Sequence, residues 1–127
     1  MNQRTENSNQ QPRAVMYCRV ARLEPGSVAI EQQRQACEDI ARSQGLKLVG
    51  NYEDVGQSGA TIARPGLLAL LTRITADQDV DWVVAVDGAR LTRKLGDGAT
   101  LAAVFRQAGV GLATTRRDLE AEVLESA

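Results

Sequence analysis

The sequence lacks histidine altogether, has only two cysteines, and draws just 3% of its 127 residues from the aromatic types. Without histidine, the chain is missing the commonest general base near neutral pH and the commonest metal ligand. Cys18 and Cys37 show no CxxC spacing and do not supply the ligands of a zinc site. We therefore expect no metal, no cofactor, and a core built from aliphatic side chains.

Long apolar runs and an excess of positive charge are also missing. No segment approaches the roughly 18 apolar residues of a membrane-spanning helix, and the N-terminus shows no apolar signal core. We therefore expect a cytoplasmic protein that makes no membrane contact. The chain has 15 basic and 16 acidic residues, whereas domains that hold nucleic acid by bulk charge are usually basic. Any phosphate contact must come from arginines gathered locally.

The pattern along the chain predicts one domain, residues 14–127, after a polar and Asn/Gln-rich leader, residues 1–13, that we expect to be disordered. Segments with strand character alternate with segments of helical periodicity. Strands are predicted at 14–20, 46–54, 79–86 and 110–115. This order predicts an α/β fold with a mostly parallel sheet of four to five strands and helices on both faces.

Local signals mark the three helices between these strands. Ser27 is a candidate cap for the first helix, and Gly45 is placed to end it. Pro65 suits the first turn of the second helix. An apolar stripe from Leu101 to Ala108 marks the third, after a loop over residues 87–98. Because Cys18 then falls in a strand and Cys37 in a helix, both are interpreted as buried small apolar residues rather than as a disulfide.

Four arginines fall near one edge of the predicted sheet. In parallel sheets, ligands bind beyond the carboxyl ends of the strands. Arg19 ends the first strand, Arg64 stands just before the second helix, and Arg90 and Arg93 follow the third strand. Guanidinium groups suit phosphate, because their planar fork gives paired, charge-assisted hydrogen bonds. We interpret the four as a group able to converge on one tetrahedral anion, with solvated surface arginines as the alternative.

Four segments in this order resemble the catalytic domain of serine recombinases, the resolvase/invertase family: YCRVA, IEQQRQAC, YEDVGQSGATIARPGL and DWVVAVDGARLTRKL. The resemblance extends from about Arg13 to Thr115 and implies the resolvase-like α/β catalytic fold. Members of that family cut DNA without metal. A serine hydroxyl attacks the phosphodiester, forms a phosphoserine link to the DNA 5′ end, and the strands are exchanged within a tetramer. Arginines hold the phosphate and offset its developing charge.

The phosphate-holding residues of the family are matched here. Arg19 occupies the arginine position of the strand-one motif Tyr-x-Arg-Val-Ser, which begins at Tyr17. Gln33 matches the glutamine of the first helix, and Arg64 matches the arginine before the second helix. Arg90 and Arg93 match both arginines of the Asp-Arg-Leu-x-Arg motif. A further glutamine of the family falls on Pro25.

The reacting groups of the family are missing. Ala21 stands at the nucleophile position, and Ala89 stands where the second motif has its acid. A methyl group has no lone pair with which to attack phosphorus. The resemblance therefore implies a catalytically inactive domain, a pseudoenzyme acting as a regulatory or interaction module with a residual phosphate-binding pocket.

Other nucleophiles and other functions remain open at this point. Four side chains could replace the serine hydroxyl as nucleophile. We interpret Ser27 as a helix cap and Ser58 as a turn residue. We expect Thr92 to point away from the arginines and Cys18 to be a buried thiol. The alternatives are an active strand-exchange enzyme with a displaced or partner-supplied nucleophile, a decayed remnant of a mobile element, and an unrelated small α/β domain. The last lacks support, since no GxxxxGK[ST] or GxGxxG motif is present.

The sequence shows no helix-turn-helix pattern and no zinc-ribbon cysteines, so we expect no separate DNA-binding domain. The segment after Thr115 has two arginines and four acids, which would not draw it to DNA. We expect the chain to contact the DNA phosphate backbone weakly, or through a partner recombinase, as a homodimer or heterodimer.

Overall fold

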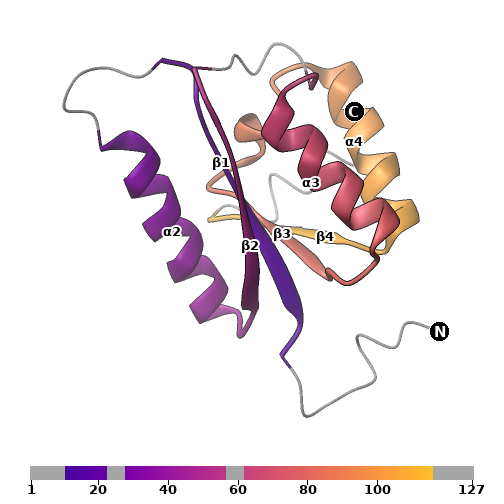
Figure 1. The fold of residues 1–127 in the computed structure, drawn as a ribbon, viewed down its shortest axis with the longest axis horizontal. Helices are drawn as coiled ribbons and strands as arrows, with labels where there is room; N and C mark the ends of the chain where they lie inside the picture. Colours follow the sequence, from indigo (N-terminus) through magenta and orange to yellow (C-terminus); the bar gives the residue numbers. More distant parts are fainter. Residues whose placement is uncertain (1–10, 23–27, 57–61, 116–127) are drawn as a thin grey trace.

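A computed structural model describes residues 11–22, 28–56 and 62–115 of the chain. Its four strands are all parallel and lie in the order β2-β1-β3-β4 (Figure 1). Helix α2 covers one face of the sheet, and α3 and α4 cover the other. The predicted α/β fold with a parallel sheet is therefore confirmed. The elements are β1 (Arg13–Val20), α2 (Ala29–Ser43), β2 (Lys47–Val55), α3 (Pro65–Ala76), β3 (Trp82–Val84), the 3-10 helix η1 (Gly88–Arg90), α4 (Leu95–Ala108) and β4 (Gly111–Ala113).

Strand β1 lies inside the sheet and is buried on both faces. Because successive strand residues point to opposite faces, Val15 and Tyr17 pack against α3 and α4, while Ala14, Met16 and Cys18 pack against α2. The helices contribute aliphatic stripes to these two cores, as the periodicity predicts. The residues with the lowest exposure in α3 are Leu67, Leu70 and Ile74.

The helix ends follow the glycine and proline signals. Gly45 and Gly109 lie just beyond α2 and α4 with φ values of 69° and 72°, a left-handed conformation in which a side chain would be strained. Pro65 is the first residue of α3. The N-cap of α2 is Val28, whose side chain makes no capping hydrogen bond. The predicted cap, Ser27, lies outside the described residues.

Several boundaries differ from those predicted, by one or two residues at each end of β2 and β4 and in more informative ways elsewhere. Strand β1 begins at Arg13, inside the predicted leader, because Arg13 pairs with Lys47 of β2 and its carbonyl accepts from the Asp81 amide at 2.8 Å. Strand β3 has only three residues, since the chain after Val84 turns toward η1. Helix α4 begins at Leu95 inside the predicted loop: its two early glycines weaken the helix signal, while Asp97 favours the helix N-terminus.

This topology gathers the candidate residues at one edge. Because all four strands are parallel, their carboxyl ends share an edge of the sheet, where β1 leads to Arg19 and β3 leads to η1. Among the described residues, no helix combines the length and apolar character needed to cross a membrane.

Candidate functional site: an arginine cluster at the carboxyl edge

Arg19 reaches from the end of β1 to the turn that follows β3. Its Nε donates to the carbonyl oxygen of Arg90 at 3.1 Å, and its Nη2 donates to the carbonyl oxygen of Ala89, also at 3.1 Å. The residue is only 3% exposed. Its guanidinium therefore fixes η1 against the end of the central strand.

Gln33 holds the backbone of Arg19 with both ends of its side-chain amide. The Arg19 amide donates to Gln33 Oε1 at 2.9 Å, and Gln33 Nε2 donates to the Arg19 carbonyl at 2.8 Å. The carbonyl of the next residue, Val20, accepts instead from Gly56 beyond β2. On the other side of β1, pairing with β3 ends at Met16. Gln33 thus supplies the hydrogen bonds that a neighbouring strand no longer gives.

Arg64 is completely buried just before α3 and binds the same turn. Its Nη1 donates to the Tyr17 hydroxyl at 2.7 Å and to the Arg90 carbonyl at 2.9 Å, and its Nη2 donates to the Leu91 carbonyl. Its guanidinium carbon lies 5.6 Å from the centre of the Tyr17 ring, a cation–π distance. Arg19 and Arg64 therefore meet at one carbonyl oxygen, that of Arg90.

Asp54 anchors this network, although the sequence analysis did not select it. Its carboxylate accepts from the amides of Gly66 and Leu67, at 2.8 and 2.9 Å, and from the Tyr17 hydroxyl at 2.7 Å. It caps α3 from β2, whereas a sequence search for caps considers the residue next to the helix, here Arg64. Burial, and then the hydrogen bond to Asp54, raises the pKa of Tyr17 above its usual range.

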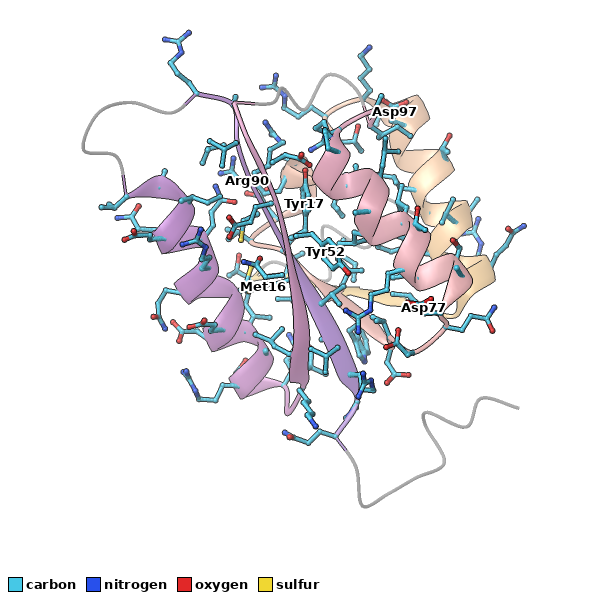
Figure 2. The ribbon with its side chains drawn as sticks, viewed as in Figure 1. Met16, Tyr17, Tyr52, Asp77, Arg90 and Asp97 are labelled. Atoms are coloured by element: carbon cyan, nitrogen blue, oxygen red, sulfur yellow. The ribbon has the colours of Figure 1, made fainter. Side chains whose placement is uncertain are left out.

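Arg90 and Arg93 bring positive charge to the solvent side of the cluster. The Arg90 side chain is 33% exposed and lies 3.9 Å from the Asp87 carboxylate. Its Nε is enclosed and has no hydrogen-bond partner among the described residues. Arg93 is exposed, as are Ala89 on η1 and Ala21 in the bend after β1. Figure 2 shows Arg90 and Tyr17 toward the carboxyl edge of the sheet.

The four arginines act on one another electrostatically. The pKa of Arg19 is lowered, first by burial and then by the positive charges of Arg64, Arg90 and Arg93. Hydrogen bonds thus bring the guanidinium groups of Arg19 and Arg64 to the backbone carbonyl of Arg90, and the side chains of Arg90 and Arg93 lie near enough for their charges to act on Arg19. An anion approaching from solvent would meet Arg90 and Arg93 first, while Arg19 and Arg64 hold the turn from below.

Of the four possible replacement nucleophiles, the structure describes two, Thr92 and Cys18. Thr92 is buried, and its hydroxyl oxygen accepts from the Lys94 amide at 3.1 Å. Cys18 is fully buried on the α2 face, as predicted. Ser27, Ser58 and Pro25 lie outside the described residues. No group of three or more acidic or cysteine side chains in the described part of the chain is arranged to hold a metal ion.

Comparisons with known proteins agree with this fold. The family model for the resolvase N-terminal domain matches residues 14–123. A solved structure of the C-terminal catalytic domain of ISC1926 TnpA, an IS607-like serine recombinase, is 29% identical with a TM-score of 0.71; the alignment covers 82% of this chain and 70% of that one.

Two further structures share the fold at lower identity. The N-terminal catalytic domain of TP901-1 integrase is 22% identical, with a TM-score of 0.77 and coverage of 90% and 92%. A resolvase family site-specific recombinase from Streptococcus pneumoniae is 23% identical, with a TM-score of 0.72 and coverage of 91% and 85%. A search of curated proteins gives no match. Because the family model spans most of the chain, the protein belongs to the resolvase N-terminal domain family, and its fold is that of serine recombinase catalytic domains.

Proposed function

We propose that this domain keeps the phosphate-binding side of a serine recombinase and has lost its covalent step, so that it acts as a regulatory or interaction module. One observation carries the proposal: Ala21, exposed after β1 and two residues from Arg19, puts a methyl group at the position of the attacking hydroxyl. Covalent catalysis needs a lone pair there, and losing a nucleophile costs several orders of magnitude in rate.

The turn after β3 supports the same proposal. Ala89 stands where the family motif has its acid, and its backbone carbonyl accepts from Arg19. In this chain Arg19 therefore holds η1 without a carboxylate at position 89. The enclosed Nε of Arg90 would gain a partner from a bound anion. Phosphate would then contact Arg90 and Arg93, with Arg19 and Arg64 as positioning residues behind them.

The ligand that fits this chemistry is the DNA phosphate backbone. The net charge of −1 favours weak contact without sequence preference, or contact made jointly with a recombinase with which the domain pairs. Pairing with an intact recombinase would give the domain a regulatory role, since a subunit without a nucleophile would stop strand exchange at its own site.

Anion binding is tested by thermal unfolding of the full chain in inorganic phosphate. A bound anion stabilises the folded state by mass action, so we expect the Tm to rise at millimolar phosphate. The rise should be lost in Arg90→Ala and retained in Arg42→Ala, a control at an exposed arginine of α2. No rise, or a rise that Arg90→Ala leaves unchanged, would overturn the phosphate site.

Loss of the covalent step is tested separately with supercoiled plasmid. After incubation and a denaturing gel, the chain should give neither nicks nor protein–DNA links. The variant carrying both Ala21→Ser and Ala89→Asp shows whether the remaining site still supports attack. A covalent link formed by the unmodified chain, and abolished by Arg90→Ala, would instead establish an active enzyme with a displaced nucleophile.

A further inference from the structure

Asp87 places a carboxylate at the start of the turn that carries Arg90. It is the residue just before η1, whose last residue is Arg90. Its Oδ1 accepts from the Arg90 amide at 3.3 Å and lies 3.9 Å from the Arg90 Nε. The two side chains are 31% and 33% exposed, so solvent reaches the pair. One carboxylate therefore faces both the backbone and the guanidinium of the same residue.

The backbone contact of this carboxylate is duplicated by other bonds. The Arg90 amide also donates to the Asp87 carbonyl at 3.3 Å. The guanidinium groups of Arg19 and Arg64 hold three successive carbonyls of the same turn. The contribution that is not duplicated is the negative charge, since residues 88–96 contain no acid.

The ion pair offsets the charge of Arg90 without completing its hydrogen bonds. A separation of 3.9 Å is too long for an N–H···O hydrogen bond, and the Arg90 Nε has no such partner among the described residues. A phosphate oxygen at about 2.9 Å would satisfy this nitrogen. It would also bring a second negative charge to the nitrogen that Asp87 already faces, and the two anions would repel each other. Phosphate and Asp87 therefore compete for one guanidinium.

We propose that Asp87 is a built-in competitor of phosphate at Arg90, which lowers the affinity of the site and makes it selective against small anions. This inference rests on the proposed phosphate site. Chloride would exchange one negative charge for another, and a single atom gives no paired hydrogen bonds. A phosphate group has several acceptor oxygens and would bond to Arg90 and to the exposed Arg93 at once. Only a ligand with that advantage overcomes the carboxylate already in place.

The test is the affinity of the full chain for inorganic phosphate, taken from the rise in Tm with phosphate concentration. Ionic strength is held constant with gluconate. Asp87→Asn removes the charge and keeps an oxygen that can accept from the Arg90 amide. We expect this variant to bind phosphate about threefold more tightly than the unmodified chain, the scale of a partly exposed ion pair. Unchanged or weaker binding would overturn the inference, and weaker binding would show that the carboxylate only holds the turn.

The matched control is Asp77→Asn, which changes the net charge by the same amount. Asp77 follows the end of α3 and lies across the molecule from Arg90 (Figure 2), so its replacement should leave phosphate affinity unchanged. Equal tightening in both variants would attribute the effect to net charge and overturn the role of Asp87. Phosphate binding that is the same in the unmodified chain and Asp87→Asn removes this inference alone. Absence of binding in both removes the phosphate site as well.

A second measurement needs no variant. The NMR signal of the Arg90 Nε–H reports directly on the nitrogen for which the two anions compete. In the unmodified chain, phosphate should shift this signal, and chloride exchanged for gluconate at the same concentration should not. In Asp87→Asn, chloride should shift it too. A chloride shift in the unmodified chain as large as that from phosphate would overturn the selectivity assigned to Asp87.

Discussion

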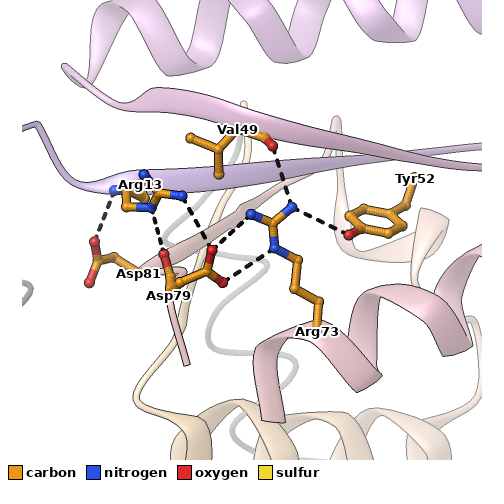
Figure 3. Close-up of polar contacts among 6 residues, drawn as sticks. All are labelled: Arg13, Val49, Tyr52, Arg73, Asp79 and Asp81. Atoms are coloured by element: carbon orange, nitrogen blue, oxygen red, sulfur yellow. Dashed lines mark hydrogen bonds and ion pairs between the residues drawn. The ribbon is translucent and has the colours of Figure 1, made fainter. Parts of the chain in front are cut away.

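The two edges of the sheet use arginine in opposite ways. At the amino edge, Arg13 and Arg73 surround the carboxylate of Asp79 (Figure 3). At the carboxyl edge, the contacts described for Arg19 and Arg64 end on backbone carbonyls and a tyrosine hydroxyl. Arginine side chains therefore neutralise a carboxylate at the amino edge, whereas at the carboxyl edge they lie close to other arginines.

The pKa directions express this difference. Hydrogen bonding to Asp79 raises the pKa of Arg73, since the partner favours the charged form. Burial, followed by the charges of Arg64 and Arg90, lowers the pKa of Arg19. The amino edge is thus electrostatically satisfied and acts as a joint between β1, α3 and the chain before β3. The carboxyl edge concentrates positive charge around a turn, the arrangement expected of a site that receives an anion.

The largest expected effect comes from removing the buried arginine at the carboxyl edge. Arg64→Ala leaves the Tyr17 hydroxyl and the Leu91 carbonyl without this donor inside the core, removes one of the two donors of the Arg90 carbonyl, and empties the space of a completely buried side chain. We expect it to lower the free energy of unfolding by about 3 kcal/mol, because each buried group left unsatisfied costs about 1 kcal/mol or more. Urea titration monitored by circular dichroism measures this loss.

The matched control at the amino edge is Arg73→Ala. Arg73 is 19% exposed and its partners lie nearer to solvent, so we expect a loss of about 1 kcal/mol. Equal losses for Arg64→Ala and Arg73→Ala would mean that the two edges do not differ in how tightly they hold their arginines.

The fold could be predicted from the sequence because its signals are local. The alternating strand and helix patterns predict the parallel sheet, and Gly45 and Gly109 predict the ends of two helices. The start of α4 was missed because Gly96 and Gly98 lie in its first turn, where they lower helix propensity. Asp97 favours the first turn of α4 electrostatically, but this signal in the sequence is weaker than the opposing signal from the two glycines.

The site could be predicted only in part, because its contacts are long-range. The arginines were found from their place after strands, but the acceptors of Arg19 are carbonyls about 70 residues away, which carry no side-chain signal. Asp54 was missed because it caps α3 from a different strand. Spacing along the chain shows which residues reach an edge, whereas the partner of each one depends on packing across the sheet.

A smaller effect is expected from Asp79→Asn, which removes the charge between Arg13 and Arg73. The carboxylate is about one-third exposed, so we expect a loss of about 1 kcal/mol at neutral pH after solvent screening. Hydrogen bonding to Arg73 lowers the pKa of Asp79. Its contribution is therefore present above the unfolded-state pKa of about 3.9 and lost as pH falls through the lower folded-state value.

The variant should accordingly flatten the decline in stability below about pH 4, measured by urea titration across that range. The control is Asp39→Asn on α2. Hydrogen bonds from Gln35 and Arg42 also lower the pKa of Asp39, but its pair with Arg42 is more exposed, so this variant should flatten the acid profile less than Asp79→Asn does. An unchanged acid profile in Asp79→Asn would show that the amino-edge ion pairs do not contribute to folding.

The smallest effect comes from adding a carboxylate where the family motif has one. Ala89→Asp places a negative charge on the exposed turn whose carbonyls bind Arg19 and Arg64, so it should partly offset the repulsion at the carboxyl edge. We expect a gain of about 0.5 kcal/mol relative to Ala89→Asn, the uncharged control of the same size, and a smaller gain at high salt. Urea titrations at two salt concentrations measure both. A loss, or a gain that salt leaves unchanged, would mean that the charge at this edge is already balanced, and the contrast between the edges would then lie in geometry alone.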